Sequence, residues 1–357
     1  MRRKFRVLAL LFCVIISSSV LAFDNQDHDN SHHSGENTEK DIRTEIKETI
    51  AHHLLDAHYY EITHGVSFPL PVILWDEGLH VFMSSKFHHG ESVAESNGKY
   101  YVLDHGKIYS TDAEGTIEYD DHHHALNNKP LDLSITKNVF IIMLMCVLLF
   151  VVFTRISKSY RNGPLPTGFG RLIEPLIIFV RDEIAIPNIG EKHYKRYMNY
   201  LLTVFFFIWF INLAGMTPLG INVTGNIAIT FALALVTFLI TQFTANKNYW
   251  GHIFWMPGVP APMKIILAPI ELLGVIIKPF ALMIRLYANI SAGHIVLMSL
   301  IGLLFVFNNW LARGAFFGLT LFLSIIELLV AFLQAYIFTM LSALYFGFAV
   351  EEHHDEH

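Results

Sequence analysis

The chain of 357 residues is 53% hydrophobic and only 16% charged, with a mean hydropathy of +0.42. This composition excludes an ordinary soluble globular protein and indicates a chain at least half embedded in a membrane. The net charge of −6 argues against nucleic acid as a partner. Cys13 and Cys146 lie in separate apolar runs, so neither a disulfide framework nor a cysteine metal site is expected.

The first 22 residues predict a signal peptide. MRRKFR supplies a basic start, VLALLFCVIISSSVLA supplies an apolar run, and the chain turns polar after Ala22, where we expect cleavage. An uncleaved anchor helix is the alternative interpretation. In both cases residues 23–137 are expected to form an exported domain.

This exported domain is expected to be a small α+β segment. TEKDIRTEIKETIAHHLLDAHYYEI, residues 38–62, has amphipathic helical spacing, whereas KYYVLD and KIYSTDAEGTIEYD alternate as the strands of small β-hairpins do.

The exported domain also holds 14 of the 20 histidines, with pairs at 32–33, 52–53 and 88–89 and a run at 122–124. Histidines this dense could bind zinc, nickel or copper. Because the pairs follow no recognised ligand spacing, a solvated, weakly buffering surface is the favoured interpretation and no metal site is expected.

Residues 138–357 are expected to form an all-α polytopic membrane domain with five spanning helices. A further segment, GRLIEPLIIFVRDEIAI, is too short to span and predicts an interfacial amphipathic helix. The five apolar stretches are residues 138–154, 198–220, 221–243, about 269–307 and about 314–350.

The basic residues of the short loops predict how these helices are oriented. The loops assigned to the inside hold eight and two lysines or arginines, and those assigned to the outside hold none and one, Arg313. Since positive charge favours the cytoplasmic side, we expect a protein of the bacterial inner membrane with a periplasmic N-terminal domain and a cytoplasmic C-terminus.

The last two apolar stretches are longer than a bilayer is thick. About 38 residues at about 1.5 Å per residue extend well beyond a hydrocarbon core of about 30 Å. We therefore expect both helices to tilt or kink, and Pro279 is a candidate for a kink.

The segment IRLYANISAGHIV, residues 284–296, places an arginine, an asparagine and a histidine inside an apolar stretch. An arginine at the bilayer centre costs about 3 kcal/mol or more, so it needs a partner or a wet cavity. On a helical projection, mostly small residues lie within about 60° of Arg285: Gly274, Lys278, Ala281, Ala288, Asn289, Ala292 and Ser299. Such a strip predicts a docking surface for a partner's transmembrane helix, with an internal packing face as the alternative.

Other ionisable groups lie in the same two stretches. His294 falls on the face of its helix opposite Arg285, and Glu327 shares one face of the last helix with Gln334, seven residues later. A contact between His294 and Glu327 would create a polar pocket for protons or water. Glu271 lies about 21 Å along the helix from Arg285, too far to be its counter-ion. That counter-ion is therefore expected to be Glu327 or a group on another chain.

Two segments of the membrane domain resemble subunit a of the F-type ATP synthase. They are ELLGVIIKPFALMIRLYANISAGHIV, residues 271–296, and ELLVAFLQAYIFTMLSALYFGFAVEEHH, residues 327–354, and the resemblance covers about residues 138–352. The His-rich exported domain has no counterpart in the common core of that family.

The resemblance implies roles for individual residues. Arg285 matches the essential arginine of the family, Asn289 its asparagine, and Gln334 the glutamine that faces the arginine from the last helix. A well-known bacterial branch has glutamate after Ala-Gly and histidine seven residues before the glutamine. This chain has His294 and Glu327 there, as the mitochondrial branch does.

The resemblance further implies a non-catalytic, proton-conducting stator subunit that provides two offset half-channels to a rotating c-ring. Arginine keeps its proton in proteins, so it does not relay protons, yet its charge favours the ionised form of a nearby carboxylate. Arg285 would thus act as an electrostatic gate. The implied partners are the c-ring, the b-subunit stalk, the remaining ATP synthase subunits and the lipid bilayer, and no cofactor is implied.

The outward half-channel is expected to be lined by His294, Glu327, Asn212 and Asn226. Hydrogen bonding between helices is the alternative role for the two asparagines. Glu271 and Lys278 are candidate lining residues near the cytoplasmic end, where snorkelling to the membrane surface is the alternative.

Two other classes of protein are weaker interpretations. A metal ion transporter fed by the exported histidines would need several intramembrane histidine and aspartate ligands, which the apolar stretches lack. An intramembrane protease would need HExxH, a serine with a suitable histidine, or a pair of intramembrane aspartates, and the sequence has none of these.

Overall fold

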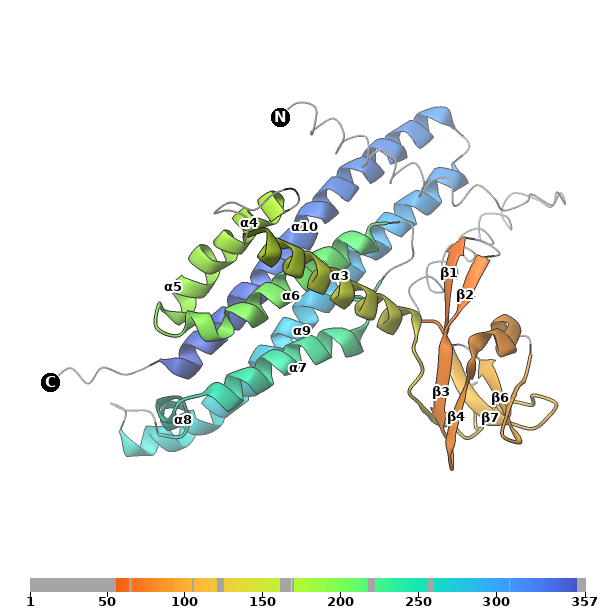
Figure 1. Ribbon diagram of the computed structural model, residues 1–357, viewed down its shortest axis with the longest axis horizontal. Helices are drawn as coiled ribbons and strands as arrows, with labels where there is room; N and C mark the ends of the chain where they lie inside the picture. The colour runs from red at the N-terminus through yellow and green to blue at the C-terminus, as the bar shows by residue number, and fades with distance from the viewer. Residues whose placement is uncertain are drawn as a thin grey trace. The chain divides into compact units, whose positions relative to one another are not determined.

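The computed structural model describes residues 56–63, 66–90, 92–104, 106–120, 125–160, 168, 170–217, 222–255, 260–307 and 309–351 (Figure 1). Contacts divide the chain into two compact units, Met1–Leu144 with Thr217–Asn222 and Met145–Met216 with Val223–His357. The predicted signal peptide, residues 38–55 of the predicted amphipathic helix, and the histidines at 32–33, 52–53 and 122–124 lie outside the described residues.

The first unit is built mainly from short antiparallel strands. Strands β1 and β2 form a hairpin, and two three-stranded sheets follow with the orders β4-β3-β8 and β5-β6-β7. The strands are β1 (Tyr59–Thr63), β2 (Val66–Pro69), β3 (Pro71–Trp75), β4 (Leu79–Met83), β5 (Ala94–Ser96), β6 (Lys99–Asp104), β7 (Lys107–Thr111) and β8 (Leu131–Asp132), with a 3₁₀ helix η1 (Ser84–Gly90) between β4 and β5.

Both three-stranded sheets contribute to one apolar core. It contains Val72, Leu74 and Phe82 from the first sheet and Tyr101 and Ile108 from the second. Alternate residues of β3 and β4 are buried, as expected for strands with one face on a core. The predicted β-structure at KYYVLD and KIYST is confirmed as the β6–β7 hairpin.

The predicted helix over residues 38–62 is wrong at its C-terminal end. Tyr59–Thr63 is strand β1, and it pairs with β2 from Tyr59 opposite Pro69 to Thr63 opposite Val66. The run Tyr59-Tyr60-Glu61-Ile62-Thr63 is rich in aromatic and β-branched residues, which favour strands when a partner strand is available. A pairing partner, which helical periodicity does not reveal, therefore decided the conformation.

Five helices of the described residues are long and apolar enough to cross a membrane, as the sequence predicts. They are α3 (Lys137–Ser159), α6 (Tyr194–Gly215), α7 (Ile227–Thr244), α9 (Ala261–Val306) and α10 (Trp310–Val350). Each contains a predominantly apolar window of 18 residues, close to the length that a bilayer requires.

The shorter helices of the second unit do not reach spanning length. The predicted interfacial segment forms α4 (Gly170–Phe179), the π-helical turn η3 (Val180–Ala185) and α5 (Ile186–Ile189) in direct succession. The segment Lys247–Phe254, between α7 and α9, forms the short helix α8.

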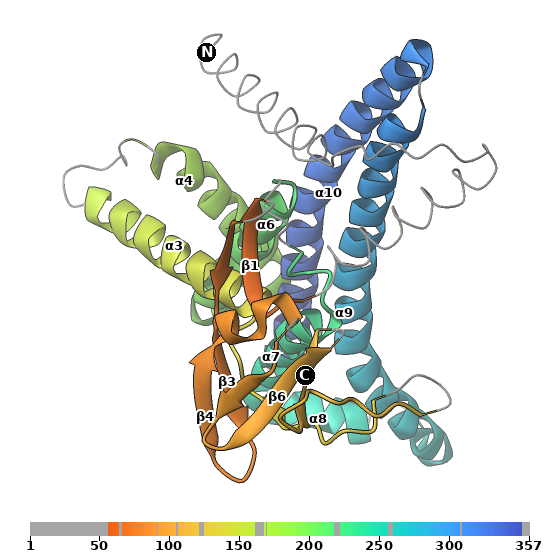
Figure 2. The same ribbon diagram turned by 90° about the vertical axis from the view of Figure 1, so that its right-hand side faces the viewer.

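Helices α9 and α10 run side by side and pack against each other (Figures 1 and 2). They contain 46 and 41 residues, so at about 1.5 Å per residue each is about 60 Å or longer, twice the hydrocarbon core. Pro269 and Pro279 both lie inside α9, and Figure 2 shows the N-terminal part of α9 turned away from the line of the rest. A proline removes one helical hydrogen bond and clashes with the preceding turn, which favours such a bend.

The C-terminal end of α10 is fastened by a residue distant in the sequence. The backbone N–H of Asn246 donates to the carbonyl of Ala349 at 2.8 Å, and its side-chain amide donates to the carbonyl of Val350 at 3.1 Å. Helix ends leave carbonyls without partners inside the helix. Asn246 satisfies two of them and joins the loop before α8 to the end of α10.

Candidate functional site

Arg285 and Asn289 lie one turn apart on the same face of α9, and both side chains are exposed in the isolated chain. The side-chain amide of Asn289 donates to the side-chain oxygen of Gln334 on α10 at 2.9 Å. Gln334 is only 1% exposed. One hydrogen bond therefore links the exposed polar face of α9 to the buried face of α10.

The small-residue strip around Arg285 is open rather than packed inside this chain. Ala281, Ala288 and Ala292 are all exposed, which favours the docking-surface interpretation over an internal packing face. Among the described residues, no carboxylate forms an ion pair with Arg285, so Glu327 is not its counter-ion in this structure.

Glu327 lies where α10 comes close to α9. An ideal Cβ built on Gly293 would be 3.4 Å from Oε1 of Glu327, so the lack of a side chain at this position makes room for the carboxyl group. His294 follows directly and is buried, at 7% exposure. Arg285 is exposed and His294 buried, as expected of residues on opposite faces of α9.

Two hydroxyl residues that sequence reasoning missed share the face of α10 that carries Glu327. Thr320 and Ser324 are buried, seven and three residues before the glutamate. Each donates to its own helix, to the carbonyl of Phe316 and to that of Thr320, both at 2.8 Å. Their oxygen lone pairs remain able to accept from water. Helical spacing from Glu327 is the sequence signal that would have found them.

The two asparagines predicted to line the outward half-channel differ in their surroundings. Asn212 on α6 is buried, and its side-chain oxygen accepts from the hydroxyl of Thr224 at 2.8 Å, while its amide nitrogen has no hydrogen-bond partner among the described residues. Asn226 instead caps α7, since its side-chain oxygen accepts from the N–H of Ala228 at 2.9 Å. Thr224 has no periodic pattern that could have identified it from the sequence.

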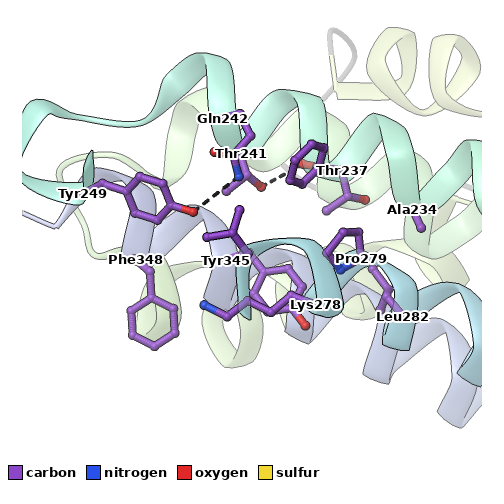
Figure 3. A pocket seen from close by; sticks show the side chains of 12 residues that line it. Ala234, Thr237, Thr241, Gln242, Tyr249, Lys278, Pro279, Leu282, Tyr345 and Phe348 are labelled. Carbon is purple, nitrogen blue, oxygen red and sulfur yellow. Dashed lines mark hydrogen bonds between the residues drawn. The ribbon is translucent and has the colours of Figure 1, made fainter. Parts of the chain in front are cut away.

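Lys278 lines a separate small pocket of mixed polar and apolar residues between α7, α8, α9 and α10 (Figure 3). Its ammonium group lies 5.9 Å from the ring centre of Tyr345 and 5.5 Å from that of Phe348, within the range of a cation–π interaction. On the facing helices, Gln242 donates to the hydroxyl of Tyr249 at 3.3 Å. Glu271, seven residues before Lys278, is half-buried.

In the first unit, a histidine lies close to a carboxylate. His58 is buried and its Nε2 lies 2.9 Å from the carboxylate of Asp132. Burial acts to raise the pKa of Asp132, but hydrogen bonds from His58 and Ser134 outweigh it and leave the pKa below its ordinary 3.8. Among the described residues, no group of three or more histidine, cysteine, aspartate or glutamate side chains is arranged to hold a metal ion.

Fold and polar groups together define a polytopic helical membrane protein with ionisable side chains between and beside its two longest helices, an arrangement typical of ion-translocating subunits. The chain belongs to the ATP synthase A chain family, the family of the membrane subunit a of F-type ATP synthase, whose model matches residues 139–347. A domain family of unknown function (DUF8433) matches residues 49–133.

Proteins named ATP synthase subunit a are similar to this chain over most of its length. The protein of Chloroherpeton thalassium is 42% identical over 233 residues, which cover 63% of this chain and 70% of the relative. The protein of Anaeromyxobacter dehalogenans is 41% identical over 72% of this chain and 69% of its own length. That of Pelodictyon phaeoclathratiforme is 39% identical over 75% and 80%.

Proposed function

We propose that this chain is the proton-conducting stator subunit of an F-type ATP synthase of the bacterial inner membrane, with Arg285 as the electrostatic gate between two offset half-channels. The observation that carries the proposal is the exposed strip on α9, where a permanent charge stands among small residues without a counter-ion from the described residues. Such a charge at membrane depth requires compensation from outside the chain. A ring of c-subunits that each present a carboxylate supplies it.

The chemistry of arginine suits this position. Its guanidinium group remains charged, so it blocks direct proton transfer between the half-channels. The same charge favours the ionised form of a carboxylate that moves past it, so each c-subunit releases its proton there. The hydrogen bond between Asn289 and Gln334 ties this face of α9 to α10 and limits the positions that Arg285 can adopt.

The outward half-channel is formed by polar groups of α6, α9 and α10. Glu327 beside Gly293, the buried His294, and the hydroxyls of Thr320 and Ser324 provide groups that exchange or conduct protons. Asn212, held by Thr224, extends this set from α6. These groups are buried or half-buried in an otherwise apolar bundle, where polar side chains are costly unless they serve a function.

The inward half-channel opens on the side of α9 that carries Glu271 and Lys278. The excess of positive charge in the loops on this side supports a cytoplasmic position for this end and for the C-terminus, and a periplasmic position for the N-terminal domain. The pocket around Lys278 includes hydroxyl, amide and ammonium groups at that end (Figure 3). The b-subunit stalk and the other synthase subunits complete the stator.

The test compares Arg285→Ala with Arg285→Lys in inverted membrane vesicles that contain the assembled complex. Arg285→Ala should abolish ATP-driven proton pumping, measured with a pH-sensitive dye, while the complex still assembles. Arg285→Lys retains a charge but can release its proton and lacks the planar fork, so it should also fail to couple. Unchanged pumping in the alanine variant would make Arg285 a structural charge and would refute the gate.

A further inference from the structure

The sheet β4-β3-β8 of the exported unit has two different faces. The inner face packs Val72, Leu74 and Phe82 into the core of the unit. The outer face receives the alternate residues of the same strands, because successive side chains on a strand point to opposite sides. In an antiparallel sheet with one solvated face, these alternate residues are normally polar.

Here the outer face is apolar at every position. Strand register places three rows of three residues across it, since Trp75 pairs with Leu79 and Leu131, Ile73 with Val81, and Pro71 with Met83. Backbone hydrogen bonds from Leu133 to Ile73 and from Ile135 to Pro71 continue the third strand. The most exposed members, at 43 to 61% exposure, are Trp75, Leu79, Val81, Met83, Leu131 and Leu133.

The second sheet of the same unit provides the contrast. On the outer face of β5-β6-β7, Glu95 pairs with Tyr100, and Asp104 with Lys107. That face carries charges of both signs, as a water-facing surface does. The apolar outer face is therefore a property of one sheet and not of the unit as a whole.

The apolar face is fastened to the beginning of a membrane span. Ile135 is two residues before α3, whose first N–H groups donate to this unit: Lys137 to the carbonyl of Ala57 at 2.8 Å and Asn138 to the carboxylate of Asp56 at 3.1 Å. The ring of Phe140, one turn into α3, lies 6.1 Å from Tyr60. These contacts fix this unit to the first turn of α3, a helix long and apolar enough to cross a bilayer.

We propose that the outer face of β4-β3-β8 rests on the bilayer, with its apolar side chains in the headgroup and upper acyl region of the leaflet in which α3 begins. Trp75 has the amphipathic ring that favours this depth. The acidic turn beside it is partly neutralised, since Lys99 lies 3.1 Å from Asp76 and 3.0 Å from Glu77. A protein partner is less favoured, because protein interfaces carry roughly one hydrogen bond per 100–200 Å² and none of the nine side chains offers more than an indole N–H.

The test places a fluorescent probe on each outer face of the full chain in its assembled complex. Cys13 and Cys146 are replaced by serine, and a single cysteine is introduced as Val81→Cys or, as the matched control, Lys107→Cys. Both positions are exposed strand residues. Each variant is labelled with bimane in detergent and reconstituted into vesicles of phosphatidylcholine that contain lipid with a nitroxide near the headgroup.

We expect the lipid nitroxide to quench the probe at position 81 several-fold more than the probe at 107, and aqueous iodide to show the opposite order. Equal iodide quenching at both positions would show a water-exposed face and overturn the proposal. Protection of position 81 from both quenchers would overturn it as well, in favour of cover by protein. Equal thermal unfolding of the two labelled complexes verifies that neither label disrupts the fold.

Discussion

Arg285 and Glu327 are ionisable residues of two apolar helices, and their surroundings differ. The arginine is exposed on α9 without a carboxylate partner in the described chain, whereas the glutamate is half-buried against Gly293. An uncompensated arginine costs about 3 kcal/mol or more at membrane depth, which an adjacent ring of carboxylates would offset. In the proposed function, the glutamate between two helices would instead exchange a proton with water or with His294.

Glu327→Gln removes that exchange while keeping the size of the side chain. Because an amide neither takes up nor releases a proton, proton-driven ATP synthesis in vesicles should fall by about tenfold or more. ATP hydrolysis by the complex after detergent uncoupling should be retained. Glu327→Asp keeps the acid and should retain part of the synthesis rate. Normal synthesis in the glutamine variant would remove Glu327 from the conducting path.

At the scale of elements, α10 is the helix that organises the second unit. It packs against α6, α7, α9 and the segment formed by η3 and α5. Its buried face consists largely of small and hydroxyl residues, which permit close helix approach. At Gly347, α5 approaches so closely that a Cβ atom would collide with the backbone carbonyl of Asn188.

Gly347→Ala should therefore destabilise the packing of α5 against α10. In an unconstrained helix, alanine in place of glycine stabilises by up to about 1 kcal/mol. Here the collision is with backbone, so we expect a net loss of about 1 to 3 kcal/mol, the usual range for overpacking. Thermal unfolding in detergent measures it. Gly318→Ala in the same helix meets no atom within 4 Å and should unfold at the wild-type temperature or above, and equal losses in both variants would contradict this account.

At the scale of the molecule, the two units are stabilised by different interactions. The second unit satisfies its backbone within long helices, as a bilayer requires. The first unit is a small β-structure with one modest core and a close pair between His58 and Asp132. Solution pH should therefore affect the stability of the first unit through this pair.

Asp132 should make the stability of the first unit depend on pH in the acidic range. Its pKa is lower in the folded state than its ordinary 3.8, so its stabilising contribution is complete above that value and is lost as the pH falls through the lower folded value. Asp132→Asn should remove this contribution and lower the unfolding free energy by about 1.5 to 3 kcal/mol near neutral pH, since the bonds to a charged acceptor are weakened.

Hydrogen exchange of β3 and β8 in the full chain, followed from pH 7 to pH 3, measures this effect. The wild-type and asparagine variants should differ most at pH 7 and converge in acid. A difference that persists undiminished at pH 3 would show that Asp132 stabilises the unit through geometry alone.

By itself, the sequence determined the five spans, the excess length of the last two, and the positions of Arg285, Asn289, His294, Glu327 and Gln334 on their helices. Apolar length and helical periodicity are local properties that a bilayer enforces directly, so they can be read without a partner. Spacing likewise predicted that Arg285 would lie on an open strip of small residues.

Only the tertiary structure decided which of these groups meet. It joined Asn289 to Gln334, placed Glu327 against Gly293, paired Asn212 with Thr224, and assigned Asn226 to the cap of α7. It also showed that residues 59–63 form a strand and that one sheet has an exposed apolar face. Apart from the Asn226 cap, which is a local contact, these outcomes depend on contacts between different elements, and periodicity along one element carries no information about the element that packs against it.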